Sequence, residues 1–427
     1  WRSYKERIAH LAQRLVDAQR PIRILNSIKW PADTYARFEQ SKWREMPKVS
    51  RDDYASNDIG FDPQQKVAQF RELREDVIRD LGETDAIGRI LVESADQYAR
   101  VVEMIVARGT PRFSELSREL YGSAKELFAD GKTAIRDVAL DMYAIFTNLD
   151  DHHLGEKVER NITGEEAVVD LQLRFDRVFG QGVVRVILDD GIIADAAAGA
   201  DYVKVRRGAR FTTRDLRVLE VHEGWVHVAT SLNGQQQPVA RWLASGPPRT
   251  AATQEGLAVL LEVLTFASYP MRARRLNDRV LAVDKVEDGA NFLEVFEWFR
   301  TEGYDEDTCY WNTQRIFRGG VLDGGSPFTK DIVYTKGIVS NYNFLRSAIA
   351  EGRADLVRWL FLGKVALEDI PVLAARAHEG VVHAPRHVPE IFKDLNGLAI
   401  WLGIATFWGR LDNREVYRFY RQMLSAT

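Results

Sequence analysis

The sequence predicts an α+β fold in which a small sheet lies between two mostly helical regions. Apolar residues recur at three- and four-residue spacing through roughly the first 160 residues, a pattern typical of helices. Two segments rich in β-branched residues follow at 183–188 and 202–206, and helical patterns then return. We therefore expect an N-terminal helical region over 1–160, a mixed central domain over 161–345, and a C-terminal helical region over 346–427 that packs on the core.

The composition excludes several classes of protein. The net charge is −4, so no overall positive field attracts nucleic acid or anionic lipid. No uninterrupted apolar run approaches the length of about 18 residues that a membrane span needs. Cys309 is the single cysteine, which excludes an intrachain disulfide and a zinc site built of thiolates. With no signal peptide visible at Trp1, we expect a cytoplasmic location.

The N-terminal region contains two clear helical patterns, over 62–81 and 85–107. Ile87, Ile90 and Leu91 illustrate the spacing that places apolar side chains on one helix face. No motif with chemistry lies in this region, so we interpret it as scaffold or as a region that shapes the substrate-binding surface.

The central domain begins with a capping box at Thr163 and Glu166, which predicts a helix through residue 179. The segments 183–188 and 202–206 predict strands, and the second could be an edge strand that pairs with an extended peptide. Thr212 or Thr213 then begins a helix that carries the motif HEGWVH, and Thr250 begins another that carries QEGLA.

HEGWVH has the pattern H-E-x-x-x-H, in which His222 and His227 flank Glu223. The familiar metallopeptidase pattern is H-E-x-x-H, with both histidines on one helix face. At about 100° per residue, residues five apart on an α-helix point about 140° apart, against about 40° for residues four apart. A π-bulge or a broken turn would bring the two imidazoles together, and Gly224 suits this because glycine tolerates unusual backbone angles.

A catalytic zinc ion needs three protein ligands and one open position. The two histidines supply two ligands, and a carboxylate from the next helix is the natural third. We favour Glu255, near the start of that helix, with Glu262 two turns later as the alternative. Glu223 is expected on the other side of one Zn²⁺ per chain, where it deprotonates the attacking water.

Two other histidine clusters resemble metal motifs. HEGVVH at 378–383 repeats the spacing, but Pro385 follows closely, so we expect a helix end with solvated histidines. His152 and His153 are adjacent, and adjacent side chains point apart, so we expect a polar loop there.

At HEGWVH and QEGLA the sequence resembles the QEGLA-motif protein family, over about residues 160 to 345. That family includes the microtubule-associated tyrosine carboxypeptidases, which remove the C-terminal tyrosine of tubulin. The resemblance implies a zincin-like metallopeptidase core and zinc held by His222, His227 and Glu255, with Glu223 catalytic. It also implies release of a C-terminal residue, tyrosine or another aromatic, from a peptide or protein. The chain reads as prokaryotic in style, so tubulin itself is not the expected substrate.

A carboxypeptidase needs a cation for the terminal carboxylate and a donor for the oxyanion. Arg315, Lys330 and Tyr334 are available, but we favour the three residues that complete the predicted site: Arg318 and Lys336 for the carboxylate and Tyr342 for the oxyanion. The arginines between 272 and 279 are expected on a solvated helix face. Two alternatives stay open: an endopeptidase or aminopeptidase on the same core, and a regulatory zinc protein without catalysis.

Overall fold

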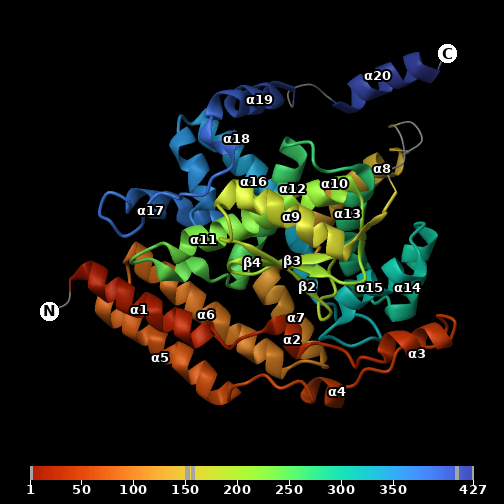
Figure 1. Ribbon diagram of the computed structural model, residues 1–427, viewed down its shortest axis with the longest axis horizontal. Coiled ribbons are helices and arrows are strands. Elements are labelled where there is room, and N and C mark those ends of the chain that lie inside the picture. Colours follow the sequence, from red (N-terminus) through yellow and green to blue (C-terminus); the bar gives the residue numbers. More distant parts are fainter. Residues whose placement is uncertain (1–2, 150–153, 155–158, 409–412, 426–427) are drawn as a thin grey trace.

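The computed structural model describes residues 3–149, 154, 159–408 and 413–425. It is mostly helical and contains two small sheets, which confirms the predicted α+β class. In Figure 1 the helices between residues 4 and 106 form the lower side of the molecule and the last two helices form the upper side. The helix at 135–147 lies toward the upper side, apart from the other N-terminal helices. The three-stranded sheet lies between these two sides in this view.

The N-terminal region is helical, as predicted. Asp62 and Asp85 cap two long helices by accepting hydrogen bonds from the backbone N–H groups of Gln65 and Gly88. The helices of this region are α1 (Tyr4–Gln19), α2 (Ile24–Ser27), α3 (Thr34–Gln40), α4 (Arg51–Ala55), α5 (Pro63–Leu81), α6 (Ala86–Val106), α7 (Pro111–Tyr121) and α8 (Ile135–Thr147). Helices α1, α5 and α6 pack against one another and α7 packs on α6.

The main sheet has three strands in the order β2-β4-β3. Strand β4 (Tyr202–Arg206) pairs in parallel with β2 (Arg185–Asp189) and antiparallel with β3 (Ala196–Ala198). The prediction that 202–206 forms an edge strand is therefore wrong, because β4 is the central strand. The edge strand is β3, and its alanines gave no signal because alanine is depleted in strands.

A second, two-stranded sheet pairs β1 (Ile162–Thr163) with β5 (Arg210–Phe211). It joins the starts of two helices, since the capping box at Thr163 begins α9 (Gly164–Phe179) and Thr212 caps α10 (Thr213–Leu219). Both starts agree with the sequence pattern.

The rest of the chain is a series of helices. In the centre these are η2 (Glu220–Val228), α11 (Ala229–Gln235), η3 (Arg241–Ala244), η4 (Pro248–Thr250), α12 (Ala251–Leu264), α13 (Pro270–Glu287), α14 (Phe292–Thr301), α15 (Glu306–Phe317), η5 (Thr329–Ile332) and α16 (Val333–Ala350). The C-terminal helices are η6 (Ala354–Phe361), η7 (Leu367–Asp369), α17 (Ile370–Ala375), α18 (Glu390–Lys393), α19 (Leu395–Trp408) and α20 (Asn413–Ser425). Across the described ranges, no helix is both long and apolar enough to cross a membrane.

Two hydrophobic cores meet at η2. The larger core draws on helices from α1 to α19, and the smaller core is formed by α9, the strands, α10 and α11. Val221 and Val226 of η2 belong to the larger core, and Val228 belongs to the smaller one. The segment with the HEGWVH motif is thus fixed from both sides by buried apolar contacts.

Candidate metal centre and active site

The HEGWVH motif lies on a π-helix, η2, inserted between the α-helices α10 and α11. The N–H group of Ala229 donates to the carbonyl of Gly224, five residues earlier. Because π-helical hydrogen bonds join residues five apart, His222 and His227 fall on one face, and their ring centroids are 4.9 Å apart. The predicted π-bulge is confirmed.

Gly224 is needed here for packing rather than for its backbone angles. Its φ angle is outside the positive range that favours glycine. A Cβ atom at this position would lie 2.4 Å from Cε1 of Phe175 on α9. The sequence identified the right residue for a different reason, because packing between distant helices leaves no local pattern.

Glu255, in the first turns of α12, lies between the two histidines. Its Oε2 atom is 3.3 Å from Nε2 of His222 and 3.3 Å from Nε2 of His227. In the described part of the chain, these residues are the only group of three or more His, Cys, Asp or Glu side chains whose ligand atoms all lie within 4.8 Å of one another. Two imidazole nitrogens and one carboxylate oxygen are a donor set suited to a catalytic zinc ion.

Glu262, the alternative third ligand, contacts the other side of the first histidine. Its Oε1 atom lies 2.7 Å from Nδ1 of His222 and 2.9 Å from a guanidinium nitrogen of Arg272. The side chain is fully buried. A carboxylate on Nδ1 fixes the orientation of the ring and leaves Nε2 directed at the site.

The histidines, the glutamates and Arg272 stabilise one another's charged forms at this site. Burial alone would lower the pKa of His222, but its hydrogen bonds to Glu255 and Glu262 outweigh burial and raise it to about 10. Burial would raise the pKa of Glu255, yet the charge of His227 and the hydrogen bonds from both histidines hold it well below its usual value. Burial is likewise outweighed at Glu262, where the charge of Arg272 and the hydrogen bond from His222 lower the pKa to about 2. The carboxylates therefore stay ionised in a buried place, where a cation is favourable.

Glu223 is buried beside the histidines and points to the edge strand. Its Oε2 atom accepts a hydrogen bond of 2.9 Å from the backbone N–H of Ala198 in β3. With His222 it lines a cavity of about 320 Å³. A carboxylate at the boundary between the histidines and a cavity is placed for proton transfer.

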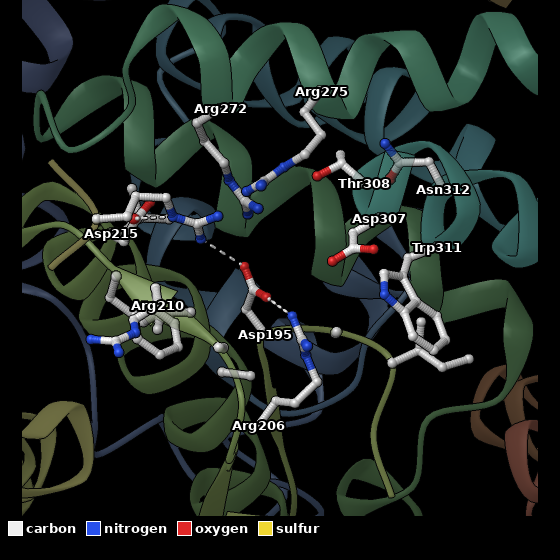
Figure 2. A pocket seen from close by; sticks show the side chains of 18 of the residues that line it. Asp195, Arg206, Arg210, Asp215, Arg272, Arg275, Asp307, Thr308, Trp311 and Asn312 are labelled. Carbon is white, nitrogen blue, oxygen red and sulfur yellow. Dashed lines mark hydrogen bonds and ion pairs between the residues drawn. The ribbon is translucent and has the colours of Figure 1, made fainter. Parts of the chain in front are cut away.

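Arginines dominate the walls of this cavity. Figure 2 shows Arg272 and Arg275 extending from one helix across the space that separates them from Asp195 and Arg206. The cavity is also lined by Arg279, Thr308, Trp311, Asn312, Arg315 and Tyr334.

All four arginines of α13 were expected on a solvated helix face, and this expectation is wrong for the three that line the cavity. Arg272, Arg275 and Arg279 are spaced three and four residues apart, so they share one face, and that face lines the cavity. The same spacing in the sequence could have indicated a common direction. It could not indicate that the direction is inward.

Two of these arginines, Arg275 and Arg279, form no ion pair in the described part of the chain, although the charge of Arg275 helps to lower the pKa of Asp195 against the effect of burial. Arg272 pairs with Glu262, whereas Arg279 donates only to the amide oxygen of Asn312, at 3.0 Å. Burial and then the charge of Arg315 lower the pKa of Arg279 to about 9. The Nε atom of Arg275 is buried without a hydrogen-bond partner. The cavity thus has unbalanced positive charge beside the two histidines and Glu255, and this charge favours an anionic ligand.

Tyr334 also faces this cavity, at the start of α16. Its hydroxyl forms no hydrogen bond with another described residue, and it lines the cavity together with Arg315. Burial and then the charge of Glu255 raise the pKa of the Tyr334 hydroxyl. The hydroxyl therefore keeps its proton and can donate a hydrogen bond.

The residues predicted to bind substrate are placed elsewhere. Lys336 forms an ion pair of 2.7 Å with Glu126, and the ring of Tyr342 packs against Trp401. Arg318 is buried with its guanidinium over the ring of Phe328. None of the three predicted residues lines the cavity beside His222 and Glu223, so the structure does not bring them to the ligand cluster.

The second motif of this spacing, at 378–383, does not form a comparable site. HEGVVH at 378–383 lies in turns rather than in a helix, and both of its histidines are exposed, as expected. His152 and His153 fall outside the described residues.

The family model described as microtubule-associated tyrosine carboxypeptidase matches residues 36–410, a range that includes the histidine pair, Glu255 and the cavity. The comparison with curated proteins gives no match. A match over most of the chain, with the two motifs meeting at one site, means that the chain belongs to the microtubule-associated tyrosine carboxypeptidase family.

Proposed function

We propose that the protein is a zinc-dependent carboxypeptidase with a zincin-like core, which removes the C-terminal residue of a peptide or protein. The observation that carries the proposal is the position of Glu255, whose Oε2 atom is equidistant from the two histidine Nε2 atoms beside an arginine-lined cavity. Membership of a carboxypeptidase family supports cleavage at the C-terminus of the substrate.

His222, His227 and Glu255 would hold the zinc ion, one per chain. When bound, zinc polarises the scissile carbonyl and makes a water molecule more acidic. Glu223 takes the proton of the attacking water and passes it to the leaving amine, because its carboxylate is buried beside the histidines at the cavity. Tyr334 donates a hydrogen bond to the developing oxyanion, since its hydroxyl is protonated and has no other partner among the described residues.

The arginines of α13 explain the direction of cleavage. Arg275 and Arg279 are positive side chains at the cavity, and neither forms an ion pair in the described ranges. The terminal carboxylate of a peptide can form that ion pair. An aminopeptidase would need free acidic groups for the substrate's ammonium, whereas Asp195 and Asp215 of this cavity are already paired with arginines. An endopeptidase needs no such charge. Arg275 and Arg279 replace Arg318 and Lys336 in our assignment, and Tyr334 replaces Tyr342.

The edge strand β3 offers a backbone to the substrate. Asp195 and Gly199 bond to β4 through Arg206 and Tyr202, so Ala196 and Ala198 turn their polar backbone groups outward. The N–H group of Ala198 reaches Glu223. An extended peptide that pairs with this edge would lie over the histidines, with its C-terminus directed to the arginines.

We propose tyrosine or another aromatic residue as the released residue. Trp311 gives the cavity an aromatic wall, and its ring stacks on Tyr35 with an interplanar angle of 2°. Thr308 and Asn312 provide polar groups nearby that can bond a phenolic hydroxyl.

The test is the zinc content per chain of the wild type and of two variants. We expect about one zinc per chain in the wild type and a large loss in Glu255→Ala, because two ligands are too few. Glu223→Gln is the matched control, which should keep the metal and lose peptidase activity. No zinc in the wild type would contradict the proposal.

A further inference from the structure

A lysine from the C-terminal part of the chain contacts the metal-site helix. Lys364 follows η6, and its ammonium donates to the carbonyl of His227, to Oγ1 of Thr230 and to Oε1 of Gln254, each at 3.0 Å. An ammonium has three N–H donors, so its hydrogen-bonding capacity is satisfied. All three acceptors are neutral, and no carboxylate in the described ranges forms an ion pair with Lys364.

The carbonyl of His227 is an unusual acceptor. The hydroxyl of Ser231 also donates to it, at 2.8 Å. This residue lies at the end of the π-helix, where the chain returns to α-helical hydrogen bonding. A change of hydrogen-bond period disturbs the regular ladder, so donors from side chains stabilise the carbonyls at such a junction.

Gln254 connects the same lysine to the other motif. Its Oε1 accepts from Lys364 and from Oγ1 of Thr230, at 2.8 Å, and its Nε2 donates to the carbonyl of Gly363. Gln254 immediately precedes Glu255. One ammonium therefore links the backbone of His227 to the residue beside Glu255.

We propose that Lys364 is a positioning residue that fixes His227 relative to Glu255 and so organises the site for metal binding. The inference rests on the proposed function, since it assumes that these residues hold the metal. It assigns a role to a residue outside both sequence motifs. It also explains the glutamine of QEGLA, which anchors the lysine rather than contacting a ligand.

The test is metal binding by Lys364→Met, which keeps most of the side-chain volume and removes every donor. Lys336→Met is the matched control, because Lys336 is bound to Glu126 away from the site. We measure zinc affinity by competition with a chelator, and the visible absorption spectrum of the Co²⁺-substituted protein, which reports ligand geometry. Loss of an outer partner of a metal ligand typically weakens binding 10–100-fold, so we expect about that loss for Lys364→Met, with a changed Co²⁺ spectrum.

Lys336→Met should match the wild type in both measurements. Unchanged affinity and an unchanged spectrum in Lys364→Met would overturn the proposal, as would an equal loss in both variants. If Lys364→Met does not fold, Lys364→Leu, which also lacks every donor, replaces it with the same expected direction. A wild type that binds no zinc would instead overturn the proposed function, so the two failures are distinguishable.

Discussion

At the scale of single residues, His222 is fixed by carboxylates on both ring nitrogens. Glu255 contacts Nε2 and Glu262 contacts Nδ1, so the ring cannot turn without losing a charge-assisted hydrogen bond. The two glutamates therefore differ in their expected contributions, although both lie on α12.

Glu262→Gln tests this difference. The variant keeps the shape of the side chain but weakens the hold on Nδ1 and leaves Arg272 without its counter-charge. We expect zinc to bind with about 10–100-fold lower affinity than in the wild type. Glu255→Ala should lose most of the metal. Equal affinity of Glu262→Gln and wild type, measured by chelator competition, would contradict the orienting role.

Arg279 is the side chain that tests the proposed carboxylate site most directly, because it lines the cavity and forms no ion pair in the described ranges. Arg279→Gln should lower kcat/KM for a peptide with a free C-terminus by about 100-fold or more, because a charged hydrogen-bond partner of a carboxylate is worth a few kcal/mol. Zinc content should not change. Arg300→Gln, which removes an exposed ion pair with Glu297, is the control. Equal kinetics for both variants would exclude Arg279 from the site.

The sequence identified the histidines, Glu223 and Glu255 because each belongs to a short motif. It offered Tyr334 only as one of several available residues and placed Arg275 and Arg279 on a solvated face, because the proximity of these side chains depends on how separate helices pack. On α16, at about 100° per residue, Lys336 and Tyr342 point about 160° and 80° away from Tyr334. Of these three side chains, only that of Tyr334 lines the cavity.

At the scale of elements, the crossing of α12 and α16 determines where Glu255 lies. A Cβ atom on Gly256 would be 2.0 Å from the backbone carbon of Gly337, so the two helices touch through their backbones. The glycine of QEGLA thus permits the close approach, while the preceding glutamate faces the histidines. The role of the glycine could not be read from the motif, because its partner, Gly337, lies far along the chain.

Gly256→Ala should separate the two helices. We expect a loss of unfolding free energy of about 2 kcal/mol or more from overpacking, together with weaker zinc binding as Glu255 moves. Gly397→Ala on α19 is the control, because a Cβ atom there meets nothing within 4 Å. Urea unfolding of the two variants checks the prediction, and equal stabilities would contradict it.

The elements themselves were largely predictable. Capping residues such as Asp62, Asp85 and Thr163 marked helix starts correctly, and 202–206 was correctly predicted as a strand. The sheet order was not predictable, because strand pairing is decided by contacts between distant segments. The short strand β3 had no sequence signal.

At the scale of the whole molecule, one large core joins the N-terminal helices to the C-terminal ones. It extends from Ile8 in α1 to Leu402 in α19. The region that carries Lys364 is thereby attached to the same body as the metal-site helix. The division of the chain at residues 160 and 345 stays a prediction.

A buried carboxylate in this core gives stability a pH dependence. Asp278 on α13 is fully buried, and burial raises its pKa to about 6 despite the hydrogen bond from Tyr304 and the charge of Arg274. Its folded-state pKa exceeds its unfolded value, so its contribution to stability is complete below about pH 4 and is lost as the pH rises through about 6.

Asp278→Asn removes this dependence. Relative to the wild type, the variant should gain about 2–3 kcal/mol of unfolding free energy between about pH 4 and about pH 7. Urea unfolding of both proteins at several pH values measures the difference. A difference that stays constant with pH, or that changes in the opposite direction, would contradict the raised pKa.

The most direct test of the central claim is mass spectrometry of a peptide that ends in tyrosine, after incubation with the zinc-loaded protein. The account predicts loss of a single C-terminal residue with the wild type. It predicts no loss with Glu223→Gln, and none from the same peptide as its C-terminal amide. Cleavage at the N-terminus or at internal bonds, or equal cleavage by Glu223→Gln, would contradict it.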